Sequence, residues 1–69
     1  MQIDKLVYMV NQITRNFAVQ GEAKAIAATT EHLKLFWDPR MRKAILAHLA
    51  AGGMGLEPMS LKALEGLRA

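Results

Sequence analysis

The side chains that could perform acid–base, nucleophilic or metal chemistry do not form a recognisable set in this sequence. The chain has no cysteine, so disulfides and thiolate metal sites are excluded, and the two histidines have no further ligands spaced with them. The six carboxylates are scattered, mostly where helix ends are expected: Asp4, Glu22, Glu31, Asp38, Glu57 and Glu65. The sequence therefore predicts no catalytic, cofactor-binding or metal-binding residue, and a chain that is not an enzyme by itself.

The residue types suited to protein binding gather in one stretch in the middle of the chain. They are Phe36, Trp37, Pro39, Arg40, Met41 and Arg42. Aromatic residues and arginine are enriched at the energetic centres of protein interfaces, so this stretch is the predicted partner-binding site. An alternative is that Phe36 and Trp37 fill space between helices while the arginines are solvated, because aromatic side chains supply core area in any small domain.

The dipeptide Asp38-Pro39 predicts a helix boundary inside this stretch. A residue before proline is displaced from the α region, so one helix is expected to end near Trp37. Asp38 is suited to N-cap the next helix, and Pro39 fits its first turn. The cations that follow would then lie at the positive end of that helix dipole. This unfavourable placement indicates that they meet an anionic group elsewhere.

Apolar residues at helical spacing predict the elements on either side of the corner. Three main helices are expected at about 4–19, 22–37 and 39–51, with Gly21 as a left-handed C-cap of the first. The predicted apolar faces are Ile3, Leu6, Val10, Ile13 and Phe17 in the first helix, Ala23, Ile26, Ala27, Thr30, Leu33 and Trp37 in the second, and Met41, Ala44, Ile45, His48 and Leu49 in the third.

The glycine-rich segment Gly52–Gly55 predicts a turn with positive φ, followed by a short fourth helix with its apolar edge at Leu61, Leu64 and Leu67 or Arg68. No alternating strand pattern occurs. The predicted fold is therefore all-α, a small bundle of three main helices plus a short C-terminal helix, in one domain covering residues 1–69. Its core is expected to contain Leu6, Val10, Ile13, Phe17, Ile26, Leu33, Ile45 and Leu49.

Composition favours a chain that associates with a partner. Sixty-nine residues with 52% apolar content hold more apolar surface than so small a domain can bury. Self-association of the isolated chain would also cover it. A polar flank of the first helix, around Asn11 and Gln12, fits either a solvated face or a wet interface, and both residues are included in the predicted binding site.

The net charge of +3 permits an acidic protein or nucleic acid as partner. The alternative function is a small helix-turn-helix-like nucleic-acid-binding protein, with Arg40, Arg42 and Lys43 opening a recognition helix. Against it, the turn lacks the usual glycine. No apolar run reaches the roughly 20 residues of a membrane span, and the N-terminus does not resemble a signal peptide, so a cytoplasmic location is expected.

The order of several motifs resembles the delta subunit of cytoplasmic NAD-dependent, molybdenum-containing formate dehydrogenases. The matching pieces are Lys5-Leu6-Val7 with Met9, Asn11-Gln12-Ile13, Phe17, Gln20-Gly21, His32 with Phe36 to Arg42, His48, Gly52-Gly53, Gly55-Leu56 and Pro58. The segment from Phe36 to Arg42, preceded by His32, is the most specific of them. Together these pieces cover nearly the whole chain.

The resemblance implies a non-catalytic accessory subunit that supports assembly or stability by binding the large catalytic subunit. It implies that the chain itself carries no cofactor. The complex as a whole is implied to carry molybdopterin guanine dinucleotide, iron–sulfur clusters, FMN and NAD, on the other subunits. With this resemblance, the interface interpretation of Arg40 and Arg42 is preferred over the solvated one.

Overall fold

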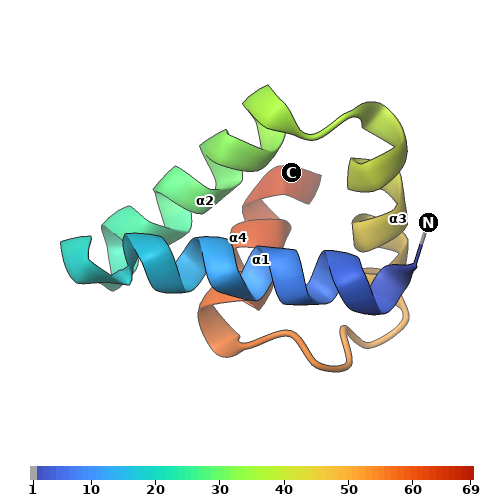
Figure 1. Cartoon of the computed structure of the whole chain (residues 1–69), viewed down its shortest axis with the longest axis horizontal. Coiled ribbons are helices and arrows are strands. Elements are labelled where there is room, and N and C mark those ends of the chain that lie inside the picture. The colour runs from blue at the N-terminus through green and yellow to red at the C-terminus, as the bar shows by residue number, and fades with distance from the viewer. Residues whose placement is uncertain (1) are drawn as a thin grey trace.

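The computed structural model describes residues 2–69, which form four α-helices and no strand (Figure 1). Helix α1 spans Ile3–Phe17 and continues into a short 3-10 turn, η1 (Ala18–Gln20). Helix α2 spans Glu22–Phe36, α3 spans Pro39–Ala50 and α4 spans Pro58–Arg68. The all-α prediction is confirmed, and the helix ends agree with those expected to within about two residues.

The helices cross one another instead of lying side by side as in an up-and-down bundle. Helices α1 and α2 form a V that is closed at η1, and α3 stands across its open end (Figure 1). Helix α4 lies behind both, and α2 packs most extensively on it. No helix among residues 2–69 is both long and apolar enough to cross a membrane.

Helix α4 is a full element of the fold and not a minor one, which corrects the expected short fourth helix. It has 11 residues against 12 in α3, and Ser60, Ala63 and Leu64 are buried. Small residues let it approach α2 closely. Thr30 Oγ1 donates to the carbonyl of Ala63 at 2.8 Å, and a Cβ added at Gly66 would lie 3.3 Å from the same hydroxyl.

Most of the predicted core residues are buried or partly buried in the core cluster, but two of them lie outside it. Leu6, Val10, Leu33 and Ile45 are buried as expected, and Ile13 and Leu49 pack partly buried against them. Phe17 and Ile26 are only half-buried and lie outside this cluster. Trp37, Leu56 and Leu64 complete it.

The buried face of α2 is rotated from the predicted one. Its fully buried residues are Ala25, Thr29 and Leu33, and Trp37 continues the same four-residue spacing. The predicted Ala23 and Ala27 are exposed. The alanine run offers almost no difference in hydrophobicity between faces, so the closest fit to α1 and α4 decides which alanine is buried.

The two predicted glycine turns form, although the first differs in detail. Gly21 has φ 97° and ψ 157°, a conformation that is not left-handed helical, and it precedes α2 directly. In the second turn Gly53 has φ 66°, and its N–H donates to the carbonyl of His48 at 2.9 Å. A Cβ at Gly53 would lie 2.8 Å from Leu61 Cδ2, so the turn needs glycine for space as well as for conformation.

Candidate partner-binding site

The corner between α2 and α3 is built as Asp38 and Pro39 predict. The last backbone bond of α2 runs from Trp37 N–H to the carbonyl of Leu33 at 3.2 Å. Asp38 has extended backbone angles, and its Oδ1 accepts from Met41 N–H at 3.0 Å. Pro39 occupies the first turn of α3, where no N–H donor is needed. The prediction of a cap and a helix boundary here is confirmed.

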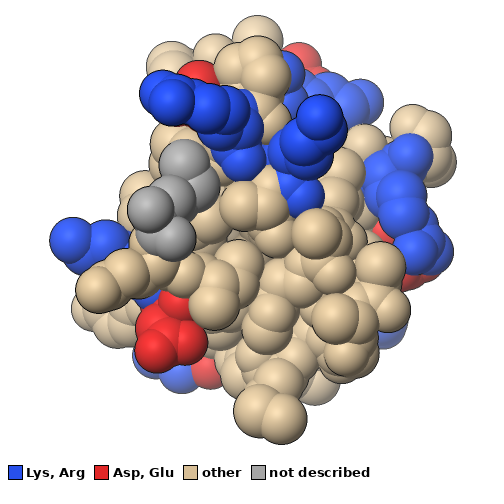
Figure 2. All heavy atoms as spheres, turned by 90° about the vertical axis from the view of Figure 1, so that its right-hand side faces the viewer, with Lys and Arg blue, Asp and Glu red and all other residues tan. Residues whose placement is uncertain are grey.

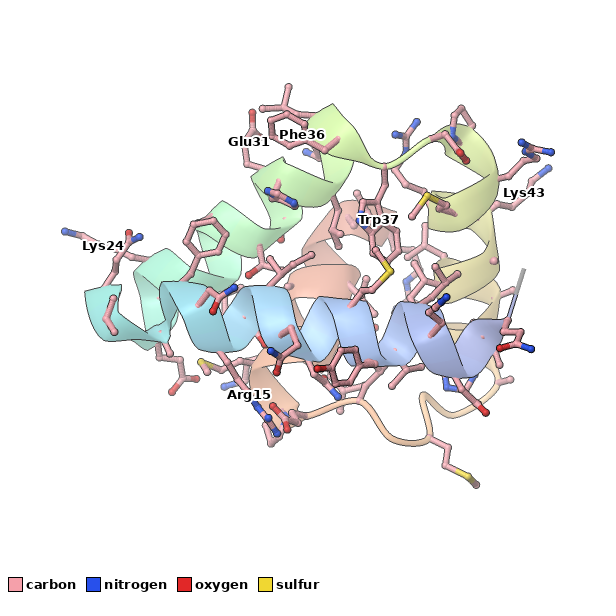
Figure 3. All side chains as sticks on the ribbon, in the orientation of Figure 1. Arg15, Lys24, Glu31, Phe36, Trp37 and Lys43 are labelled. Atoms are coloured by element: carbon pink, nitrogen blue, oxygen red, sulfur yellow. The ribbon has the colours of Figure 1, made fainter. Side chains whose placement is uncertain are left out.

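The two aromatic residues of the corner go to opposite sides of the backbone. Trp37 is only 5% exposed and belongs to the core cluster, whereas Phe36 is 71% exposed (Figure 3). Its neighbour Leu35 is 66% exposed. The core interpretation is therefore right for Trp37 and wrong for Phe36.

Phe36 belongs to a row of three contacting aromatic rings that was not predicted from the sequence. Its ring centroid lies 4.8 Å from that of His32, one turn earlier in α2, and His32 makes an edge-on contact with Phe17 of α1 at 6.3 Å. The four-residue spacing of His32 and Phe36 was the available signal. Leu35 was also missed, and no local pattern marks it as exposed.

Arg42 and Arg40 have different environments. Arg42 Nη1 donates to the carbonyl of Trp37 and, at 3.4 Å, to that of Lys34. These carbonyls are at the negative end of the α2 dipole, so the anionic group expected for these cations is, for Arg42, the C-terminus of the preceding helix. The side chain of Arg40 is exposed and makes no hydrogen bond or ion pair within residues 2–69. Of the two arginines, Arg40 is the one available to a partner.

The polar flank of α1 also divides into two roles. Asn11 Oδ1 accepts from Glu57 N–H at 3.1 Å and from Ser60 Oγ at 2.7 Å, and Asn11 Nδ2 donates to the carbonyl of Gly55 at 3.0 Å. The Asn11 amide is thus largely used inside the fold. Gln12 lies half-buried beside Arg15, with 3.5 Å between Gln12 Oε1 and Arg15 Nη1. Its role in binding stays a prediction, as do those of exposed Pro39 and half-buried Met41.

Three of the six carboxylates form ion pairs within residues 2–69, whereas Lys34, Arg40 and Lys43 pair with no carboxylate there. Glu57 pairs with Arg15, Glu22 with Lys62 at 2.8 Å, and Glu65 with Arg68 at 2.6 Å. The hydrogen bond and charge of Lys62 lower the pKa of Glu22, and those of Glu57 raise the pKa of Arg15. These pairs are exposed and contribute little to stability.

The outer side of α3 is basic at one edge and otherwise largely uncharged. No acidic residue occurs between Asp38 and Glu57. Figure 2 shows lysine and arginine side chains at the upper edge of this face, above a broad surface of uncharged residues. Lys43 extends outward from the second turn of α3 (Figure 3). Residues 2–69 contain no pocket and no group of three or more side chains placed to hold a metal ion.

The fold and the corner together define a small all-α protein with an exposed apolar and basic surface. The family model described as "NADH-dependant formate dehydrogenase delta subunit FdsD" matches residues 5–64, and the chain belongs to this family. The resemblance carried by the motifs from Lys5 to Pro58 is thereby confirmed. No curated protein and no solved structure matches the chain.

Proposed function

We propose that the chain is a non-catalytic accessory subunit of a cytoplasmic formate dehydrogenase complex, and that it supports assembly or stability by binding the large catalytic subunit. The observation that supports this proposal is the family match over residues 5–64, which makes the chain a delta subunit of an NADH-dependent formate dehydrogenase. The exposed side chains of Phe36 and Arg40 at the corner support a role in binding, because aromatic residues and arginine are enriched at protein interfaces.

Several of the side chains that could perform chemistry have structural roles in the described fold. Asp38 caps α3, and Glu22 and Glu57 form ion pairs. His48 Nε2 lies 2.8 Å from the carbonyl of Met54, which fixes the glycine-rich turn, and His32 lies between two phenylalanine rings. The proposal therefore assigns the molybdopterin, iron–sulfur, FMN and NAD sites of the complex to the other subunits.

Affinity capture of a tagged chain from its host tests the proposal. The large catalytic subunit should be recovered, together with the rest of the complex. Recovery of nucleic acid instead would support the helix-turn-helix alternative, and recovery of the tagged chain alone would contradict binding to the dehydrogenase. A second tagged protein of similar size and charge is the control for non-specific capture by a basic surface.

Deletion of the chain separates a supporting role from a catalytic one. A host lacking it should contain less assembled complex, while each assembled complex should oxidise formate at a normal rate. The isolated chain should bind no metal or flavin, as measured by elemental analysis and absorbance. A normal amount of complex that is inactive would contradict the supporting role, and a stoichiometric cofactor in the isolated chain would contradict the assignment of cofactors to other subunits.

A further inference from the structure

We infer that Leu35 and Phe36 are the apolar centre of the surface that binds the large catalytic subunit, and that they enter an apolar pocket bordered by carboxylates. This inference rests on the proposed function and adds to it the contacting residues and the chemistry of the partner. The two side chains are adjacent, and they are 66% and 71% exposed. Among the exposed large apolar residues described, they are the only neighbouring pair.

The backbone that presents this pair is held rigidly. Trp37, the next residue, is anchored in the core, and Asp38 caps α3. Arg42 reaches back to the carbonyls of Lys34 and Trp37, on both sides of the pair. A side chain on such a support loses little conformational freedom on binding, which favours affinity.

Phe36 itself is restrained by its contact with His32, whose ring centroid lies 4.8 Å away. His32 also contacts Phe17 of α1, so the ring of Phe36 ends a row that extends over both helices. An aromatic ring that contacts the protein on one side and has most of its surface in water is suited to be an anchor residue that enters a pocket of the partner.

The charges around the pair indicate the chemistry of the partner. Lys34 lies on the same last turn of α2, and Arg40 lies on the first turn of α3 across the corner. Two carboxylates, Glu31 and Asp38, are also nearby, and the cap bond from Met41 N–H leaves the negative charge of Asp38 in place. The cations of the corner, with Arg42 included, still outnumber these two acids, so a partner surface with carboxylates at the rim is complementary to this one.

A second copy of the chain fits this surface poorly. A symmetric dimer centred on Phe36 would bring Lys34 and Arg40 of one copy toward the same residues of the other, which is repulsive. Two side chains also supply only a small part of the roughly 800 Å² per partner that a stable interface buries. The rest has to come from a larger surface that extends from the corner, which a large subunit can provide.

Binding of full-length variants to the complex prepared from a host lacking this chain tests the inference. Phe36→Ala should weaken binding by about 30-fold or more, the effect of an interface hot spot, and Leu35→Ala by about tenfold, because leucine is less common among hot spots. Their helical content and melting should stay close to those of the wild type, because both side chains are exposed. Val19→Ala is the matched control: Val19 is 90% exposed at η1, away from the corner, and its loss should change affinity by less than about threefold.

A separate variant tests whether the partner surface carries carboxylates beside the pocket. Arg40→Glu should weaken binding and reduce its dependence on salt, since it removes a cation facing carboxylates. An Arg40→Glu variant with unchanged affinity and salt dependence would overturn the carboxylate rim.

Three other results would overturn the inference, and they are distinguishable from one another. The first is a variant with both Leu35→Ala and Phe36→Ala that binds the complex as well as the wild type does. The binding surface would then be elsewhere, and the proposed function would stand. If the wild type does not bind the complex, both fail. If the isolated chain sediments as a dimer that Phe36→Ala dissociates, the corner belongs to a second copy.

Discussion

Asn11 Oδ1 accepts a hydrogen bond from Ser60 Oγ at 2.7 Å, which joins α1 to the first turn of α4. The same oxygen accepts from Glu57 N–H, the N-cap residue of α4, whose own side chain makes no cap bond. In a capping box this N–H is satisfied by a side chain three residues later in the same helix. Here a residue from α1 replaces it, so the start of α4 depends on the position of α1.

The first prediction is that Asn11→Ala destabilises the fold by about 2–3 kcal/mol, because it leaves Glu57 N–H, Ser60 Oγ and the Gly55 carbonyl without their partner. Urea unfolding followed by circular dichroism measures the change. Gln12→Ala is the matched control, the next residue on the same helix, and should stay within about 0.5 kcal/mol of the wild type. Equal stability of the two variants would contradict the structural role of Asn11.

The second prediction separates the two arginines of the corner. Arg42→Ala should lower the free energy of unfolding by about 1 kcal/mol, because the last carbonyls of α2 lose a charged donor. Arg40→Ala should change it by less than about 0.5 kcal/mol, since Arg40 makes no contact of this kind within residues 2–69. Thermal melting of both variants checks this. An Arg40 variant that is the less stable of the two would contradict the assignment.

Helix boundaries could be predicted because their signals are local. Asp38 and Pro39 act on the backbone beside them, and the glycines of the second turn act through their own φ angles. The role of Asn11 could not be predicted, because its partners lie 44 to 49 positions further along the chain. The role of Arg42 could not be predicted either. Its unfavourable position at the start of α3 is explained by its bonds to the last carbonyls of α2, and these are known only from the structure.

The rotated face of α2 and the division of the aromatic pair differ in how far the sequence could predict them. The alanines at positions 23, 25, 27 and 28 are equal in hydrophobicity, so packing against α1 and α4 decides which of them is buried. At the corner, Trp37 continues the four-residue spacing of Thr29 and Leu33, so helical periodicity places it in the apolar face and leaves Phe36 outside.

The third prediction concerns the ion pair between Glu22 and Lys62. The pKa of Glu22 is lowered from its ordinary value of 4.5 by the hydrogen bond and charge of Lys62. A carboxyl whose pKa is lower in the folded state contributes stability above its unfolded pKa and loses it as the pH falls through the folded one. The contribution of this ion pair to the stability of the fold is therefore complete above about pH 4.5, and it disappears in more acid solution.

Replacement of the cation tests this assignment. Lys62→Met should raise the pKa of Glu22 toward its ordinary value, as measured by the carboxyl carbon shift in an NMR titration. Arg68→Met, on the same helix, should leave the pKa of Glu22 unchanged, because Arg68 pairs with Glu65. High salt should reduce the difference between wild type and Lys62→Met, since the pair is exposed. A pKa of Glu22 unaffected by Lys62→Met would contradict the assignment.

The fourth prediction concerns two buried threonines that differ in their hydrogen bonding. Thr14 Oγ1 donates to the carbonyl of Asn11 at 2.8 Å and lies 3.1 Å from Ser60 Oγ. Thr29 is equally buried, at the contact of α2 with its neighbours, and its hydroxyl has no hydrogen-bond partner within residues 2–69. Burial of a hydroxyl without a partner costs about 1–3 kcal/mol in protein mutational data.

Thr29→Val should therefore stabilise the fold by about 1 kcal/mol, because valine keeps the branched shape and has a similar helix propensity while removing the unpaired hydroxyl. Thr14→Val makes the same change of atoms but breaks a bond to the carbonyl of Asn11, and it should destabilise the fold by about 1–2 kcal/mol. The opposite signs distinguish hydrogen bonding from packing, since both substitutions replace one hydroxyl by one methyl group at a fully buried position. Urea unfolding of the two variants measures them, and a loss of stability in Thr29→Val as large as that in Thr14→Val would mean that the Thr29 hydroxyl is hydrogen-bonded in solution.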